Sequence, residues 1–125
     1  MIELGKIDIE IYKCVTEDIT TDEVVITEKQ IAHIMERHPN DYERYFCFVR
    51  QILSEPDYIL EANRPNTAFV LKHIVENGKN YQLILRLKTS SDPAEYKNSV
   101  ITFLKVEEKR YDRYLRTKKI LYKAE

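Results

Sequence analysis

Three residues of the N-terminal half, His33, Arg37 and His38, have side chains that suit acid–base chemistry on a phosphate ester. On a helix, His33 and Arg37 lie one turn apart on the same side. Imidazole titrates near neutral pH and can transfer protons, and a guanidinium can hold a phosphate. A solvated helix face with cations near its C-terminus would show the same pattern. The spacing alone leaves both interpretations open.

The sequence predicts neither a metal site nor a cofactor site. The histidines at 33 and 38 are five residues apart, so on a helix they diverge by about 140°. An HExxH site needs its two histidines on one face. Cys14 and Cys47 lack ligand spacing and are expected to be buried free thiols. Because the chain has only two glycines, a glycine-rich phosphate loop is also excluded.

A basic segment with interleaved tyrosines in the C-terminal half is a second candidate site. Residues 1–63 hold six Lys and Arg against 14 Asp and Glu, whereas residues 64–125 hold 14 against seven. On a helix, Lys109, Arg113 and Arg116 share one face, and Arg110 lies beside Tyr114. This pattern suits neutralisation of phosphates and stacking on bases. A solvated terminal helix with Glu–Lys pairs is the open alternative.

Two helices are predicted to position the first group. Thr27 and Gln30 form a capping box that starts a helix at residue 28, and Pro39 ends it. Asn40 and Glu43 form a second box, which opens a helix running to residue 55. Each helix has an apolar stripe that must be buried. The stripes are Ile31, Ile34 and Met35 in the first helix, and Tyr45, Phe46, Val49, Ile52 and Leu53 in the second.

Several strands are predicted from alternating or β-branched residues. Alternation of isoleucine with polar residues indicates a strand over residues 7–11. Further strands are expected at residues 58–60, 68–75, 80–87, 99–106 and 120–122, with a helix at 107–117. Thr102 is the polar residue of an otherwise apolar strand, where it is either an ordinary β-branched residue or a hydroxyl that binds a phosphate oxygen.

The Asn77-Gly78 pair predicts a hairpin with a two-residue type I′ turn, which would place His73 opposite Gln82. One face would then be apolar and cover the helices. Lys72 would lie on that face, either snorkelling at the sheet edge or serving in catalysis. The other face would be mixed and would carry Phe69, Leu71, His73, Gln82, Ile84 and Arg86.

These elements predict an α+β fold in which two N-terminal helices pack on one face of an antiparallel sheet of three or four strands. The 125 residues fit a single domain. Residues 1–22 would form an N-terminal strand and loop extension, and residues 23–123 the core. No segment approaches the ~20 apolar residues of a membrane span, and the N-terminus lacks the features of a secretion signal. A cytoplasmic location without membrane contact is expected.

Four short segments of residues 23–123 carry a resemblance to a known group. They are Val25-Ile26-Thr27, His33-Ile34-Met35-Glu36-Arg37-His38-Pro39, Ile52-Leu53-Ser54-Glu55-Pro56-Asp57 and Asn98-Ser99-Val100-Ile101-Thr102. The chain resembles the phage-associated barnase–EndoU–colicin–RelE-like (BECR) nucleases. This resemblance implies helices on one side of the sheet, RNA on the other, and metal-free cleavage through the ribose 2′-hydroxyl. His33, Arg37 and His38 match the "H…RH" element, and Thr102 matches the hydroxyl of the "iiT" strand.

The resulting hypothesis is a metal-independent, toxin-type ribonuclease of phage or mobile-element origin. His38 or His33 would be the general base, Arg37 and Arg86 would stabilise the developing charge, and Thr102 would orient a phosphate oxygen. Arg86 enters by strand geometry and not by the resemblance. The expected RNA-binding residues are Lys72, His73, Lys105, Lys109, Arg110, Arg113 and Arg116.

The expected partners are RNA and, as a further candidate, an immunity or antitoxin protein. A phage accessory or regulatory module that binds nucleic acid or protein without catalysis is the alternative, and a structural protein with a solvated basic tail is a third. The position of the candidate residues distinguishes these functions. Their convergence within reach of one phosphate would favour catalysis, because a general base must lie within hydrogen-bond distance of its proton. Scatter over opposite faces would favour a binding module.

Overall fold

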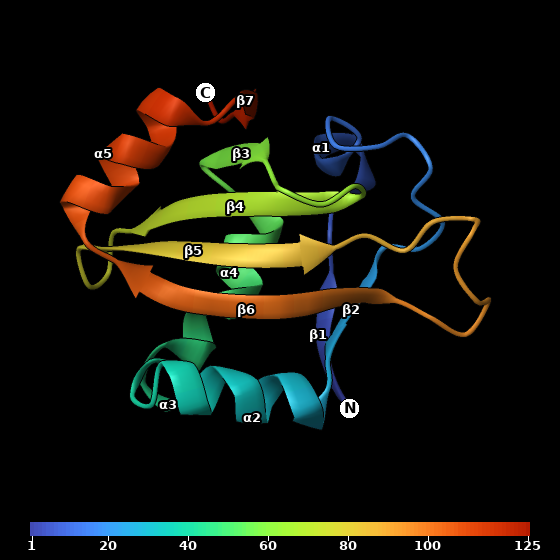
Figure 1. Ribbon diagram of the computed structural model, residues 1–125, viewed down its shortest axis with the longest axis horizontal. Coiled ribbons are helices and arrows are strands. Elements are labelled where there is room, and N and C mark those ends of the chain that lie inside the picture. The colour runs from blue at the N-terminus through green and yellow to red at the C-terminus, as the bar shows by residue number, and fades with distance from the viewer.

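The computed structural model describes residues 1–125, with the exception of the Asp41 side chain. A seven-stranded sheet crosses the molecule in the order β1-β2-β6-β5-β4-β3-β7 (Figure 1). Neighbouring strands are antiparallel, except for the parallel pair β2 and β6. The strands are β1 (Ile2–Lys6), β2 (Glu23–Ile26), β3 (Tyr58–Glu61), β4 (Thr67–Ile74), β5 (Lys79–Arg86), β6 (Asn98–Val106) and β7 (Ile120–Lys123).

Five short α-helices and one 3-10 turn accompany the sheet. They are α1 (Ile9–Tyr12), α2 (Glu28–Arg37), α3 (Asp41–Tyr45), the 3-10 turn η1 (Phe46–Phe48), α4 (Val49–Ser54) and α5 (Glu108–Thr117). The α+β class is therefore confirmed, although the sheet has more strands than the three or four expected. Among the described residues, no helix has both the length and the apolar character needed to cross a membrane.

The N-terminal segment differs from the prediction. Residues 9–12 form a helix in place of the expected strand, because the Asp8 carboxylate caps it by accepting the Glu10 backbone N–H at 3.0 Å. The isoleucine alternation at 7, 9 and 11 was therefore misleading. Tyr12 is fully buried and donates its hydroxyl proton to the Leu53 carbonyl at 2.7 Å. This segment, together with β1, packs into the main core.

Helix α2 starts as the capping residues predict. The Thr27 hydroxyl accepts the Gln30 backbone N–H at 3.2 Å, and His38 is extended (φ −138°) before Pro39. Ile34 is fully buried, but Met35 is 38% exposed, so its assignment to the buried stripe was wrong. The helix contacts the core through Ile34 and the half-buried Ile31, and Met35 lies outside that contact.

The second predicted helix is divided into α3, η1 and α4. Asn40 makes no side-chain cap, so the expected second capping box does not form. A 3-10 turn aligns residues three apart, and Tyr45 and Phe48 both contact the Tyr81 ring, with centroids 5.2 and 5.9 Å away. Packing of these aromatic rings on the sheet accounts for the irregular turn. Cys14 and Cys47 are free thiols as expected, but Cys14 is only half-buried and Cys47 is exposed, so their expected burial was wrong.

The β4–β5 hairpin has a four-residue loop, and its predicted register was wrong by two. His73 pairs with Asn80 and not with Gln82. A type I′ turn needs two residues with positive φ, whereas in this loop only Gly78 has one, at +68°. The Asn77 side chain instead accepts the Lys79 backbone N–H and donates to the Tyr81 hydroxyl. Because the shift is an even number, every side chain stays on its predicted face.

The two faces of the central strands are covered differently. Val70, Leu83 and Leu85 face the main core, which also contains Ile34 of α2 and Ile52 of α4. In Figure 1, α4 passes behind β4 and β5. The opposite face has a smaller cluster, to which α5 contributes three half-buried side chains. That cluster comprises Leu60, Phe69, Leu71 and Ile84 of the sheet with Tyr58, Ala62, Tyr111, Tyr114 and Leu115.

Candidate functional site

The face of the sheet opposite the main core is only partly covered, and we call it the open face. Cross-strand pairing brings Phe69, Ile84 and Thr102 into one row across β4, β5 and β6. Helix α5 covers one part of this face, where the Tyr114 ring meets Phe69 edge-on with centroids 4.9 Å apart. Burial raises the pKa of Tyr111 in the same contact. The row continues to Thr102 on β6, which is half-buried.

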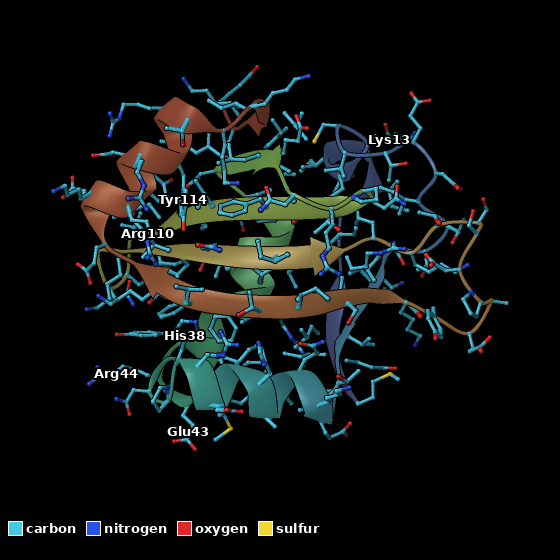
Figure 2. The ribbon with its side chains drawn as sticks, in the orientation of Figure 1. Lys13, His38, Glu43, Arg44, Arg110 and Tyr114 are labelled. Carbon is cyan, nitrogen blue, oxygen red and sulfur yellow. The ribbon has the colours of Figure 1, made fainter. Side chains whose placement is uncertain are left out.

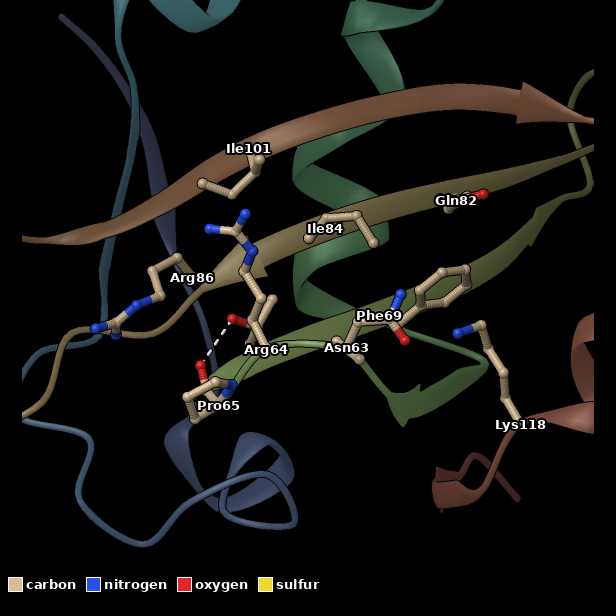
Figure 3. A pocket seen from close by; sticks show the side chains of 11 residues that line it. Asn63, Arg64, Pro65, Phe69, Gln82, Ile84, Arg86, Ile101 and Lys118 are labelled. Atoms are coloured by element: carbon tan, nitrogen blue, oxygen red, sulfur yellow. Dashed lines mark hydrogen bonds between the residues drawn. The ribbon is translucent and has the colours of Figure 1, made fainter.

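A pocket of about 770 Å³ opens on this face, which is within the usual range for small-molecule sites. Its sides are formed by the strands, the loop between β3 and β4, and Lys118 after α5 (Figure 3). A β-bulge in β6 adds the Ile101 side chain to the wall. The lining residues are Ala62, Asn63, Arg64, Pro65, Thr67, Phe69, Gln82, Ile84, Arg86, Ile101 and Lys118.

Among the described side chains, three cations and no carboxylate line this pocket. Arg64 is exposed, and neither Arg64 nor Lys118 forms an ion pair with any described residue. The Lys118 ammonium lies over the Phe69 ring, 4.7 Å from its centroid. Arg86 is held by the Leu87 carbonyl and by the Asp92 carboxylate, which is 3.1 Å from Nη2. The pocket therefore combines an apolar floor with a cationic rim.

Asp92 fixes Arg86 from outside the pocket. Its carboxylate accepts the Thr89 backbone N–H at 2.8 Å and the Thr89 hydroxyl at 3.3 Å. These hydrogen bonds and the charge of Arg86 hold the pKa of Asp92 below its ordinary value, with the backbone contact as the largest cause. Arg86 therefore has a fixed anionic neighbour on one side, and its side chain borders the pocket on the other.

Gln82 is the unusual polar residue of the pocket wall. It is only 9% exposed, and its Oε1 atom is buried without a hydrogen-bond partner among the described residues. An unsatisfied buried acceptor costs about 1–3 kcal/mol. Most buried polar groups are hydrogen-bonded, so an exception of this kind calls for a functional or structural reason.

The predicted catalytic residues do not meet at one point. His33 and Arg37 are exposed on α2, and His38 is half-buried at its C-terminus. Arg86 ends β5 and pairs with Ser99 near the start of β6. Figure 2 shows His38 beside the opposite end of β6, and both α2 and α3 contact that strand. At about 3.3 Å per strand residue, His38 and Arg86 are separated by on the order of 20 Å along the strands.

Thr102 lies between these two regions. It pairs with Ile84 on the open face, next to the pocket residue Ile101, and is half-buried. The structure therefore brings Thr102 and Arg86 to the same face but separates both from a direct contact with the α2 histidines. No described set of three His, Cys, Asp or Glu side chains is placed to hold a metal ion.

Lys72 and His73 are both engaged with neighbours near the hairpin. The Lys72 ammonium is 3.2 Å from one oxygen of Asp57, and the other oxygen accepts the His73 backbone N–H at 2.7 Å. The His73 ring is exposed, with Nδ1 2.8 Å from the Asn80 side-chain oxygen. Neither residue lines the pocket.

The remaining predicted RNA-binding residues lie on the exposed surface of α5 and at Lys105, near the end of β6. Figure 2 places Arg110 at the same end of the sheet as His38, and Tyr114 over β4. Lys105 is ion-paired with Glu107. The exposed cations of α5 are Lys109, Arg110, Arg113 and Arg116.

Sequence reasoning missed Asn63, Arg64 and Lys118, because a loop and a helix end carry no periodic pattern that would assign them to a face. Phe69 and Gln82 were assigned to the mixed face but were not proposed as site residues. An available signal was the position of Gln82 among apolar β5 residues, since a buried polar side chain is more informative than an exposed one.

A model of phage-type nuclease domains matches residues 1–123. The chain belongs to this family, described as phage-Barnase-EndoU-ColicinE5/D-RelE like nuclease 2 (PBECR2). The predicted resemblance is confirmed, and the match also includes the first 22 residues. Nucleic acid is accordingly its class of substrate. No curated protein and no solved structure is significantly similar to the chain.

Proposed function

We propose that the chain cleaves RNA without a metal ion, by attack of the ribose 2′-hydroxyl on the adjacent phosphate. The 2′-hydroxyl loses its proton to a base, the bond from phosphorus to the 5′-oxygen of the next nucleotide breaks, and that oxygen takes up a proton, leaving a 2′,3′-cyclic phosphate. The observation that carries this proposal is the pocket on the open face, where Arg64, Arg86 and Lys118 surround an apolar floor. Such a surface can bind phosphates through its cations and bases through its apolar residues.

The side chains available for ligation support a metal-free reaction. Mg²⁺ in nucleotide-processing sites is bound through carboxylates and substrate phosphates, and no described set of three His, Cys, Asp or Glu side chains is placed to hold a metal ion. Cationic side chains such as Arg37 can instead stabilise phosphate charge. Removal of divalent metal should therefore leave cleavage unchanged.

Because His38 and Arg86 are far apart, the proposed mechanism divides the protein surface into two regions that contact the same bound RNA strand. In the first, His38 or His33 acts as general base and Arg37 stabilises the negative charge of the transition state. In the second, Arg86 with Arg64 and Lys118 holds a flanking phosphate of the same RNA. Thr102 lies between the regions on β6 and would orient a phosphate oxygen. The cations of α5 and Lys105, with His73 near the hairpin, would contact the RNA backbone further along. Lys72 is ion-paired with Asp57 and belongs to the core face of β4, so it is not assigned a contact with RNA.

Single-turnover cleavage of a mixed-sequence RNA tests the catalytic assignment. His38→Ala or His33→Ala should slow the reaction by roughly 10²–10⁴ with little change in affinity, since a general base contributes about this much. Glu36→Ala on the exposed side of α2 is the matched control and should retain the wild-type rate. DNA of the same sequence should stay intact because it lacks the 2′-hydroxyl. If neither histidine variant is slower, these residues are not the base.

A second candidate function is binding of nucleic acid without cleavage. The predicted catalytic residues do not converge within reach of one phosphate, and this favours the binding function by the criterion given above. The exposed positions of His33 and Arg37, away from the pocket, favour it too. Wild-type protein that binds RNA but leaves it intact in the same assay would establish this function in place of ours.

A toxin role and a cytoplasmic location follow from RNA cleavage as further proposals. A ribonuclease of this kind would be harmful to the cell that makes it, so an immunity or antitoxin protein would have to neutralise it. The basic surface of α5 would suit an acidic partner that competes with RNA. Expression of the wild-type chain, but not of the His38→Ala variant, should then arrest growth.

A further inference from the structure

Gln82 is a buried polar residue in the wall of the pocket, beside its apolar floor. Phe69 and Gln82 are diagonal neighbours on the open face, because Phe69 pairs with Ile84, two residues along β5. Gln82 is 9% exposed, whereas Ile84 and Ile101 are half-buried and present apolar surface to the pocket. A planar base lying against this floor would bring one of its edges to the Gln82 amide.

The cations occupy the outer part of the same pocket. Arg64 is exposed, and the Arg86 side chain retains 36% of its accessible surface. In Figure 3, Arg64 and Arg86 lie toward one end of the pocket and Lys118 toward the other, with Phe69, Ile84 and Gln82 among the residues that line it. Phosphates stay in contact with water, so the outer cations suit the backbone on either side of the base. Asn63 and Thr67 are further polar residues of the lining, but Asn63 is exposed and the Thr67 hydroxyl donates to the Pro65 carbonyl, so Gln82 is the buried one whose acceptor has no partner among the described residues.

We propose that this pocket is a base-reading subsite that prefers adenine, with Gln82 as the residue that determines the preference. A glutamine amide can accept a hydrogen bond from the adenine 6-amino group and donate one to a ring nitrogen, and this is the pairing that glutamine favours. The Oε1 atom is buried and has no partner among the described residues. Rotation of the Gln82 side chain toward the pocket would let this atom accept a hydrogen bond from the amino group. Guanine is instead read mainly by Arg or Lys, which here face the phosphates. The inference rests on the proposed function in taking RNA as the ligand.

Binding of non-cleavable RNA tests this subsite independently of catalysis. Pentamers with 2′-O-methyl riboses, UUAUU, UUGUU, UUCUU and UUUUU, cannot undergo 2′-hydroxyl attack. A fifth pentamer carries unsubstituted purine at the centre and differs from UUAUU only by the missing amino group. We expect UUAUU to bind roughly 10-fold more tightly than the purine pentamer, as one well-placed base contact provides.

Variants at Gln82 should remove the preference without loss of stability. Gln82→Leu deletes the amide, and Gln82→Asn keeps an amide but retracts it by one methylene. Both should bind all five pentamers with similar affinity. Because Gln82→Leu also removes an unsatisfied buried acceptor, its melting temperature should equal or exceed that of the wild type. Gln51→Leu, a half-buried glutamine on α4, is the matched control and should keep the adenine preference.

Several results would overturn the inference. These are equal binding of the five pentamers by the wild type, tighter binding of UUGUU, or an adenine preference that survives in both Gln82 variants. A melting temperature well below the wild type for Gln82→Leu would instead assign Gln82 a structural role. An adenine preference in a protein that never cleaves RNA would refute the proposed function and leave the subsite intact.

Discussion

Removal of two pocket cations tests whether the open face is the RNA-binding surface. Arg64 and Lys118 have no ion-pair partner among the described residues, so replacing both by alanine leaves no buried or paired charge behind. For single strands, the logarithm of the binding constant changes with the logarithm of salt concentration by about 0.7 per phosphate contact. Two lost contacts therefore reduce the slope by about 1.4. If the variant and the wild type bind equally at 1 M salt, the variant binds about 25-fold more weakly than the wild type at 0.1 M salt. At 0.5 M salt it binds about 3-fold more weakly.

The assay is a salt titration of binding with a 2′-O-methyl RNA that the protein cannot cleave. Lys6→Ala/Lys13→Ala is the control, because both lysines are exposed in the N-terminal segment and neither lines the pocket. The control should lower affinity only slightly at each salt concentration. An unchanged slope in the Arg64→Ala/Lys118→Ala variant, or an equal change in both double variants, would show that RNA binds elsewhere.

Three further predictions concern stability and metal. Leu83→Ala should lower the free energy of unfolding by about 2–5 kcal/mol, because Leu83 is fully buried in the main core; a urea-measured loss below about 1 kcal/mol would contradict that core. EDTA should leave the RNA cleavage rate unchanged, and a rate that vanishes with chelation and returns with metal would refute the proposed mechanism. The lowered pKa of Asp92 means that its contribution to stability is complete above the ordinary carboxyl range and is lost as pH falls through the lowered value. Asp92→Asn should therefore flatten the stability profile on the acid side of the ordinary carboxyl range, and an identical profile would show that the hydrogen bonds and ion pair of the Asp92 carboxylate do not matter.

Elements with local end signals could be predicted from the sequence. Thr27 and Pro39 mark both ends of α2, and the hydroxyl of Thr27 makes the predicted cap. The strands β3 to β7 and helix α5 lie within a few residues of their predicted positions. In each case the apolar pattern and the turn residues act over fewer than a dozen positions, so no knowledge of distant contacts is required.

Elements that depend on distant partners could not be predicted. β1 has one buried residue, Leu4, and its pairing with β2 joins segments about 20 residues apart. β2 in turn pairs with β6 through Val24 and Val25, far along the chain. Such pairings are stabilised by tertiary contacts and not by local propensity. The hairpin register failed for a related reason, because Asn77 uses its side chain to build a longer loop.

The candidate site was predicted only in part for the same physical reason. Arg86 and Thr102 were assigned to the open face because strand residues alternate, and that alternation survives a register error of two. Arg64 reaches the pocket through a loop in which Asn66 has φ +56°, a conformation with no clear sequence signal here. Lys118 reaches it because α5 crosses the sheet, which its own sequence does not specify.

The distance between His38 and Arg86 sets a requirement on the substrate. Arg86 cannot stabilise charge at a phosphate that His38 serves, because the two lie at opposite ends of the strands. Asp92 also anchors Arg86 through the loop after β5, so the guanidinium is held in place. A nucleic acid that contacts both residues must therefore span the length of these strands. Binding of a phosphate at Arg86 can then favour cleavage near His38 only by fixing the position of the RNA between the two residues. The binding energy of that remote contact would serve to orient the reacting phosphate.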